Sequence, residues 1–326
     1  MNLLQFPTEV LLLILRLLGA AFFRDDIRRL MVSKLWYELA RPILLEDLVF
    51  SEQSLQKFLN VDMSSLVHQH TRTVNFALDG VQDDRAAATA SRHKQQHILA
   101  QWVANVGEDL ISLASILQDC RDLRSVELKP GPKWRVSWVM SRTWFLPNAL
   151  ISLLNVGHLT CLEFDTISTG IGGPSRGTGG PSYRETSHLC DNINVLLPTL
   201  RRLRCRMRKI CPRVLIPPGD DTLSNLEEVI INLNLNDPTR RTPLQHSHRC
   251  GIFESGSPRR WIADMEAGAK ELVNRMATPR VVRILSCPRS GDEMESFDAI
   301  AGRRMKLATG AAWDADGEEV FGDDDE

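Results

Sequence analysis

Four arginines alternate with apolar residues in one short segment, and their side chains could bind anions. They are Arg202, Arg204, Arg206 and Arg208. The planar guanidinium group matches two oxygens of a carboxylate or a phosphate, so this row predicts a client-binding surface for an acidic or phosphorylated protein segment. The alternative is pairing within the chain. Neighbouring strands lie about 4.8 Å apart, which would place Glu163, Asp165 and Glu228 beside the arginines. Both interpretations stay open at this point.

A segment with two histidines and a cysteine superficially suggests a metal site. It reads His246-Ser247-His248-Arg249-Cys250. A structural zinc site needs four ligands in a tetrahedron, and such sites normally combine two ligand clusters. The sequence shows no second cluster, and Cys205 and Cys211 would qualify only if the fold brought them close. We therefore expect an exposed polar loop, with no metal ion and no cofactor.

Signatures of catalysis are not evident in the chain. The segment 170–181 is rich in glycine, but no Gly-Lys-Ser/Thr follows it, and Pro174 and Pro181 interrupt the helix that would hold a phosphate. A nucleophile elbow, a paired acid and base, and a cofactor fingerprint are also missing from the sequence. We expect no catalytic residues, and a binding protein in place of an enzyme.

The arginines belong to one of several runs of the form Leu-x-x-Leu-x-Leu. The clear runs begin at Leu123, Leu159, Leu200 and Leu226, after a weaker member at Thr71. Alternation at period two predicts a strand in each run. Segments of helical pattern separate or follow the runs, at 98–117, 146–154, 189–197 and 261–276. Strand, helix and strand in succession predict an α/β fold with parallel strands, and a further strand is expected at 281–285.

The first fifty residues predict a bundle of three short helices. Pro7 favours the start of a first helix near residues 8–18, and its segment 10–18 is apolar everywhere except at Arg16. Asp25 or Asp26 can cap a second helix, and a third helix is expected to stop at Pro42. Three short amphipathic helices bury too little surface to be secure alone, so docking to another chain or to the next domain is expected.

The order and spacing of residues in this region resemble the F-box, whose family binds the small Skp-type adaptor of cullin-RING ubiquitin ligases. The resemblance is carried by Phe6-Pro7-Thr8-Glu9-Val10-Leu11, Asp26-Ile27, Val32-Ser33-Lys34-Leu35-Trp36 and Arg41-Pro42. By this resemblance, the residues that dock on the adaptor or support its binding are Phe6, Pro7, Val10, Leu11, Ile14, Leu30, Val32 and Trp36.

The resemblance implies a substrate-recognition subunit of an SCF-type ubiquitin ligase, which would bring a protein client to ubiquitin-dependent degradation. The later runs resemble an irregular leucine-rich repeat, the module that many F-box proteins use to hold a substrate. Leu-Leu-Pro-Thr-Leu-Arg-Arg-Leu-Arg at 196–204, with the N-terminal motif, is similar to F-box-type proteins of filamentous fungi. The alternative is a non-degradative interaction scaffold with no ligase role.

Composition favours an intracellular protein without a global preference for nucleic acid or membrane. The chain has 39 basic and 41 acidic residues, for a formal net charge of −2. Its seven cysteines are odd in number and scattered, which favours free thiols in a reducing compartment, the cytoplasm or the nucleus. The apolar stretch 10–23 is too short to span a bilayer, and Arg16 interrupts it.

These patterns predict three regions. They are an F-box-like motif at 1–50, an irregular repeat domain at 51–305 with disordered loops near 168–183 and 237–258, and an acidic disordered tail at 306–326. The tail carries Trp313 and Phe321 among acidic residues. It is a solvated segment by default, and the alternative is docking on the basic stretch 201–213 of the same chain.

Overall fold

The structure is a computed structural model of the chain. It describes residues 6–61, 64–78, 92–130, 147–166, 189–235, 246–250, 258–287, 294–308 and 311–319. Within these ranges no helix combines the length and the apolar character that crossing a membrane requires.

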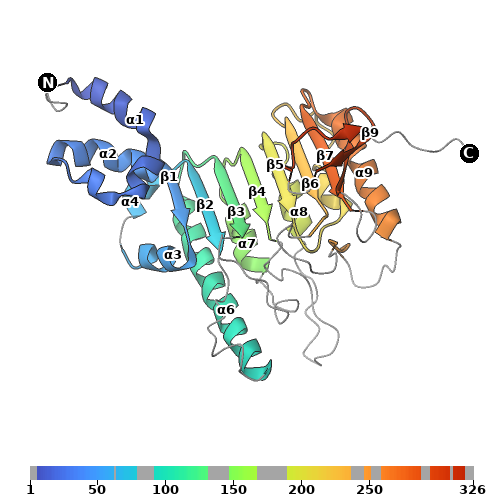
Figure 1. Ribbon diagram of the computed structural model, residues 1–326, viewed down its shortest axis with the longest axis horizontal. Helices are drawn as coiled ribbons and strands as arrows, with labels where there is room; N and C mark the ends of the chain where they lie inside the picture. The colour runs from blue at the N-terminus through green and yellow to red at the C-terminus, as the bar shows by residue number, and fades with distance from the viewer. Residues whose placement is uncertain are drawn as a thin grey trace, which may run out of the picture.

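A ten-stranded β-sheet runs through the described part of the chain, and strands that are neighbours in the sheet are consecutive in the sequence (Figure 1). The strands are β1 (Asp47–Phe50), β2 (Thr73–Leu78), β3 (Ser125–Pro130), β4 (Cys161–Asp165), β5 (Arg202–Arg206), β6 (Glu228–Asn232), β7 (Val281–Ser286), β8 (Met294–Asp298), β9 (Arg303–Leu307) and β10 (Glu318–Glu319). The first seven are parallel, and the last three continue the sheet with antiparallel pairing. The predicted α/β class with parallel strands is confirmed.

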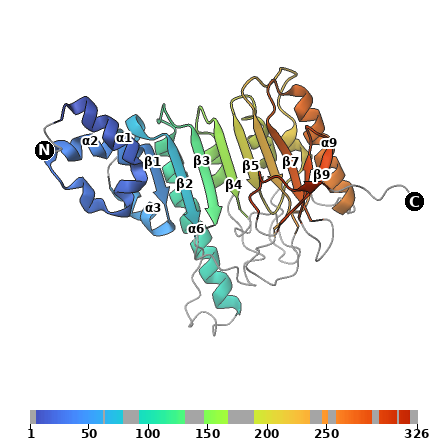
Figure 2. The ribbon, with the colours of Figure 1, turned by 45° about the horizontal axis from the view of Figure 1, so that its top comes forward.

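Helices and short 3-10 turns precede and connect the strands. They are α1 (Thr8–Asp25), η2 (Ile27–Leu30), α2 (Lys34–Glu46), α3 (Glu52–Leu59), α4 (Ser64–His70), α6 (Arg92–Leu117), α7 (Pro147–Leu154), α8 (Leu189–Asn194), η4 (Pro212–Leu215) and α9 (Pro258–Arg275). Figure 1 shows α6, α7, α8 and α9 along one face of the sheet, and Figure 2 shows α6 extending beyond the ends of the strands.

Alternate strand positions form the core between the sheet and these helices. Leu162 and Phe164 of β4 and Leu203 and Cys205 of β5 are fully buried there. The residues between them point to the opposite face because side chains alternate along a strand. Both strands therefore have one face buried against the helices and one polar face.

The N-terminal helices pack on a small core of their own. It consists of Leu15, Phe23, Leu30, Trp36, Ala40 and Ile43. A kink at Gly19 divides α1, since this glycine has φ 73° and ψ 172°. The Asp26 side chain accepts a hydrogen bond from the Arg28 N–H at 3.0 Å and caps η2, as one of the two predicted caps.

The expected helix end at Pro42 is wrong, because α2 continues through Pro42 to Glu46. A proline inside a helix removes one hydrogen bond and costs about 3 kcal/mol. Ile43 and Leu45, which follow it, are 3% and 4% exposed. Burial of these two side chains offsets the cost of the proline, so the helix reaches the sheet without a break.

The N-terminal region joins the sheet directly, since α2 leads without a loop into the edge strand β1. β1 pairs in parallel with β2, and the Arg72 N–H donates to the Glu46 carbonyl at 2.8 Å. The Arg24 Nη2 also donates to Asp47 Oδ2 at 2.7 Å, which fixes the end of α1 to β1. Residues 1–50 thus contribute a strand to the sheet that follows them.

Several segments differ from the expectations or lie outside the described residues. The expected helix at 189–197 ends at Asn194, and the sequence did not predict β1, β8, β9 or β10. The loop near 168–183 lies outside the described residues, as does most of 237–258. His246 to Cys250 is described and forms bridges with Lys209 and Asn234. Residues 311–319, assigned to a disordered tail, are ordered on the sheet.

Candidate functional site

Exposed apolar side chains are concentrated at the N-terminus. Nine of the fifteen exposed large apolar residues in the described parts of the chain lie between Val10 and Tyr37. We define the N-terminal apolar surface as Val10, Leu13, Leu17, Leu18, Ile27, Met31, Val32 and Leu35. Leu17 and Met31 are each 80% exposed, which leaves almost the whole side chain in water. Clusters of this kind on folded proteins mark binding surfaces.

The helices present this surface because their other faces are already occupied by the small core. Val10, Leu13 and Leu17 recur at helical spacing along one side of α1. Leu11 and Leu15 on the opposite side are fully buried. Met31 and Val32 lie in the short turn between η2 and α2, where the Ser33 side chain caps α2 by accepting from the Trp36 N–H at 3.1 Å.

The structure divides the eight predicted adaptor residues into exposed and buried positions. Val10 and Val32 are 38% and 58% exposed, and Pro7 is also exposed. Phe6 and Ile14 are half-buried. The remaining three, Leu11, Leu30 and Trp36, are at most 5% exposed. These three can support the surface but cannot contact a partner without a rearrangement. Leu13, Leu17, Met31 and Leu35 were not among the predicted residues, although their helical spacing was visible in the sequence.

Three of the four predicted client-binding arginines are engaged within the chain. Arg206 binds Asp165 across β4 and β5, with Nε 2.9 Å from Oδ1. Arg204 Nε forms an ion pair with Glu228, and Arg202 Nε lies 3.6 Å from the same carboxylate. The cross-strand pairing considered from the sequence is therefore what the structure shows for these three residues.

Arg208 differs from the other three arginines. It is half-buried, and none of the described carboxylates forms an ion pair with it. Burial lowers the pKa of Arg208 because the charged guanidinium loses solvation. A desolvated cation without an acidic partner gains most when an anion binds beside it.

The acidic C-terminal segment lies on the polar face of the sheet. The Arg206 guanidinium lies 5.0 Å from the centre of the Trp313 ring, and Arg204 Nη2 lies 2.7 Å from Asp314 Oδ2. Arg283 donates to the Ala315 carbonyl at 2.6 Å and to Asp316 at 2.8 Å. The alternative interpretation of the tail was docking on the basic stretch 201–213. The structure shows this docking for Trp313 and Asp314. Phe321 lies outside the described residues.

This segment also covers apolar residues on the same face. Ile230, Leu285 and Leu307 form a separate buried cluster, and Ala311, Trp313 and Ala315 pack against it. Ile230 points away from the helices, yet it is fully buried. The tail therefore closes a part of the sheet that the helices leave open.

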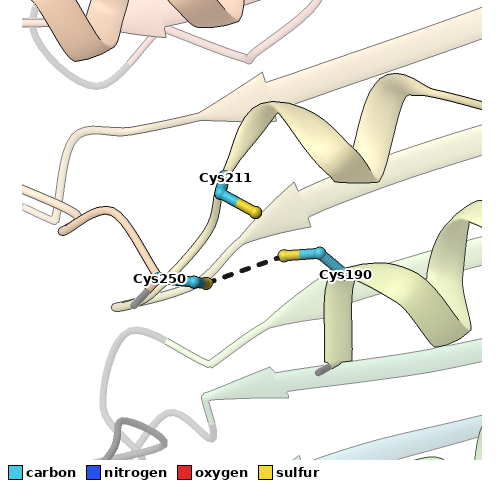
Figure 3. Close-up of side chains that lie close together, drawn as sticks. All are labelled: Cys190, Cys211 and Cys250. Atoms are coloured by element: carbon cyan, nitrogen blue, oxygen red, sulfur yellow. Dashed lines mark hydrogen bonds between the residues drawn. The ribbon is translucent and has the colours of Figure 1, made fainter. Parts of the chain in front are cut away.

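Three cysteines from distant parts of the sequence meet in the structure. Cys190, Cys211 and Cys250 place their sulfur atoms within 4.8 Å of one another, and the structure groups no other metal-binding side chains in this way among the described residues (Figure 3). From the sequence, Cys205 and Cys211 were possible metal ligands beside Cys250 only if the fold brought them close. Cys211 does lie beside Cys250, whereas Cys205 is buried elsewhere in β5, and Cys190 was not anticipated.

Cys190 and Cys250 are thiols with suppressed ionisation when no metal is bound. Hydrogen bonding to Cys211 and Cys250, together with burial, raises the pKa of Cys190 well above its ordinary value. The Cys190 sulfur lowers the pKa of Cys250, but contact with Cys211 and burial outweigh it and raise this pKa to about 12. Thiols of this kind are weak nucleophiles at neutral pH.

Comparison with known proteins adds no family assignment. No protein-family model matches the chain, and a search of curated proteins found no significant match.

Proposed function

We propose that this chain is the substrate-recognition subunit of a cullin-RING ubiquitin ligase of the SCF type. The F-box-like residues and the N-terminal apolar surface support this proposal. In it, a Skp-type adaptor covers Leu13, Leu17, Met31 and Val32, while Trp36 and Leu30 hold the helices in place from inside. In this proposal the chain acts by connecting two proteins, and catalysis is left to the other subunits of the ligase. The observation that carries the proposal is the concentration of exposed apolar side chains in the first forty residues.

The decisive experiment is co-purification of the chain with a Skp-type adaptor. We expect the wild type to bind and the double variant Leu17→Glu with Met31→Glu to bind at least about a hundredfold more weakly. Each apolar side chain contributes about 1.5 kcal/mol or more when buried, and a carboxylate in an apolar interface adds a further cost. Both positions are exposed in the free chain, so the double variant should fold normally.

Val195→Glu is the matched control, because Val195 is 60% exposed and lies far from the N-terminal helices in the sequence. Its adaptor binding should equal that of the wild type. Equal binding by the double variant, or no binding by the wild type, would reject the proposal. If the chain binds the adaptor but client levels do not change when the protein is removed, the non-degradative scaffold is favoured instead.

The client side of the proposal rests on the polar face near Arg208. An acidic client segment would supply the carboxylate or phosphate that this half-buried cation lacks among the described residues. Arg208→Glu should therefore remove the client from the captured complex and leave the adaptor bound. Arg121→Glu, an exposed control outside the sheet, should keep both partners.

A further inference from the structure

Three segments that are distant in the sequence bring the cysteine cluster together. Cys190 lies in the first turn of α8, Cys211 directly precedes η4, and Cys250 ends the segment that begins at His246. Figure 3 shows the three side chains pointing toward a common centre. Convergence of this kind is unusual for cysteines that act only as small apolar residues, because nothing about packing requires three sulfur atoms to meet.

The spacing of the sulfur atoms matches metal coordination better than a disulfide bond. Cys190 Sγ and Cys250 Sγ are 3.8 Å apart. A zinc ion with Zn–S bonds of about 2.3 Å in a tetrahedron places its sulfur ligands about 3.8 Å from one another. A disulfide needs about 2.05 Å between the sulfur atoms, which would require the two segments to approach further and would exclude Cys211.

Backbone contacts hold the three segments in this arrangement. The Ile210 N–H, one residue before Cys211, donates to the His248 carbonyl at 3.0 Å. Asn194 at the end of α8 donates from its side chain to the Arg213 carbonyl at 3.1 Å. The positions of the cysteines are therefore determined by hydrogen bonds that do not involve the sulfur atoms, as a pre-organised site requires.

Burial and charge around the cluster also suit a metal ion. Cys190 and Cys211 are 0% and 4% exposed, whereas Cys250 is half-buried and is therefore partly accessible to solvent. Three thiolates with one divalent ion carry a net charge of −1. Lys209 lies close enough to Cys250 for its positive charge to favour the Cys250 thiolate. Among the described residues no fourth side chain joins the group, so water from the Cys250 side is the expected fourth ligand.

We propose that Cys190, Cys211 and Cys250 bind one zinc ion as a structural site. The ion joins α8, the approach to η4 and the segment 246–250, and so fastens the crossover that follows β5 to the helix layer. This inference does not depend on the proposed ligase role, since its readouts are metal content and stability.

The test uses the full chain, purified under reducing conditions and dialysed against buffer without zinc. We expect about one zinc ion per chain by elemental analysis. Replacement of zinc by Co²⁺ should give intense sulfur-to-cobalt charge-transfer absorption. Cys211→Ser should lose that absorption and bind zinc at least about tenfold more weakly, because one of three protein ligands is removed. Cys161→Ser, which changes a cysteine in β4 outside the cluster, should behave as the wild type.

A stability measurement keeps the test informative if a variant folds poorly. A zinc chelator should lower the Tm of the wild type and of Cys161→Ser, because a metal that binds the folded state stabilises it. It should leave the Tm of Cys211→Ser unchanged. A reduced wild type without zinc and without cobalt–thiolate absorption would overturn the proposal, and so would a Cys190–Cys250 disulfide formed in place of metal binding.

Discussion

Trp36 connects the parts of the N-terminal bundle. Its indole Nε1 donates to the Arg29 carbonyl at 2.7 Å, and its ring lies edge-on to Phe23 with centroids 6.5 Å apart. The side chain is 5% exposed. Trp36 therefore holds η2 and α1 against α2, and the N-terminal apolar surface depends on it without including it.

We expect Trp36→Ala to lower the free energy of unfolding by about 3–5 kcal/mol, because it leaves a cavity and an unpaired Arg29 carbonyl. Chemical denaturation followed by circular dichroism measures this change. Leu17→Ala is the control, since Leu17 is 80% exposed and its loss should change stability by no more than about 0.5 kcal/mol. Equal effects of the two substitutions would contradict the assignment of Trp36 to the interior.

The ion pair between Arg204 and Asp314 makes docking of the tail sensitive to acid. Burial alone would raise the pKa of Asp314, but the hydrogen bonds that its carboxylate accepts and the charges of Arg204 and Arg283 together outweigh burial, so this pKa falls below its ordinary value of 3.8. A carboxyl group with a lowered pKa in the folded state stabilises that state above its unfolded pKa. The contribution is lost as the pH falls through the folded pKa.

We therefore expect the docking of residues 311–319 to be constant from about pH 7 to pH 5 and to weaken below pH 3.8. The difference in tryptophan emission between the wild type and Trp313→Phe reports on it. In Asp314→Asn this acid-dependent step should disappear, and docking should already be weaker at neutral pH. An identical acid transition in Asp314→Asn would show that another group is responsible.

At the scale of the element, the kink in α1 depends on one backbone conformation. Gly19 has φ 73° and ψ 172°, a region that side chains other than glycine rarely adopt. A Cβ atom at this position would meet no atom within 4 Å, so the requirement is conformational and not steric. The kink lets Leu15 and Phe23, which lie on either side of it, reach the same small core.

Gly19→Ala should lower the free energy of unfolding by about 1–3 kcal/mol, the usual cost of such a strained conformation. Thermal unfolding measures the loss. Gly157→Ala provides the comparison, because a Cβ at Gly157 also meets no atom and the backbone there is not in the left-handed region. Similar losses in both variants would mean that the kink has no special requirement for glycine.

At the scale of the molecule, one sheet connects regions that the sequence separates. The N-terminal region supplies the edge strand β1, and the C-terminal segment returns to the polar face and ends in β10. Deletion of residues 1–48 would consequently remove half of β1 and expose the edge of β2. Single substitutions on the N-terminal apolar surface test adaptor binding more cleanly than such a truncation.

Truncation after Ala308 should destabilise the protein by about 1–3 kcal/mol, because Trp313 and its neighbours no longer cover Ile230, Leu285 and Leu307. A lower Tm and increased binding of a hydrophobic dye are the expected results. Truncation after Glu319 retains β10 and the docked segment, and it should leave both measurements unchanged. Equal Tm values and equal dye binding for the two truncated proteins would contradict the covering role.

Much of the sheet follows from local pattern. The runs from Thr71 to Leu233 predicted β2 to β6 because alternation of apolar and polar residues is readable within a few positions. Because helical segments lie between these strands, the strands were expected to be parallel. The excess of apolar residues in α1 could also be read from residues that are close together in the sequence. By contrast, β8 to β10 escaped prediction because Ser296 and Arg304 interrupt any clear apolar alternation, and pairing with neighbours determines these strands.

The α/β class, the parallel strands and the apolar helices at the N-terminus could be predicted from the residues alone, since each depends on neighbours along the chain. The contact of Arg204 with Asp314, which is 110 residues away, and the meeting of Cys190 with Cys211 and Cys250 became visible only in the folded chain. Such contacts depend on how the crossovers return to the sheet, and residue spacing does not reveal that path.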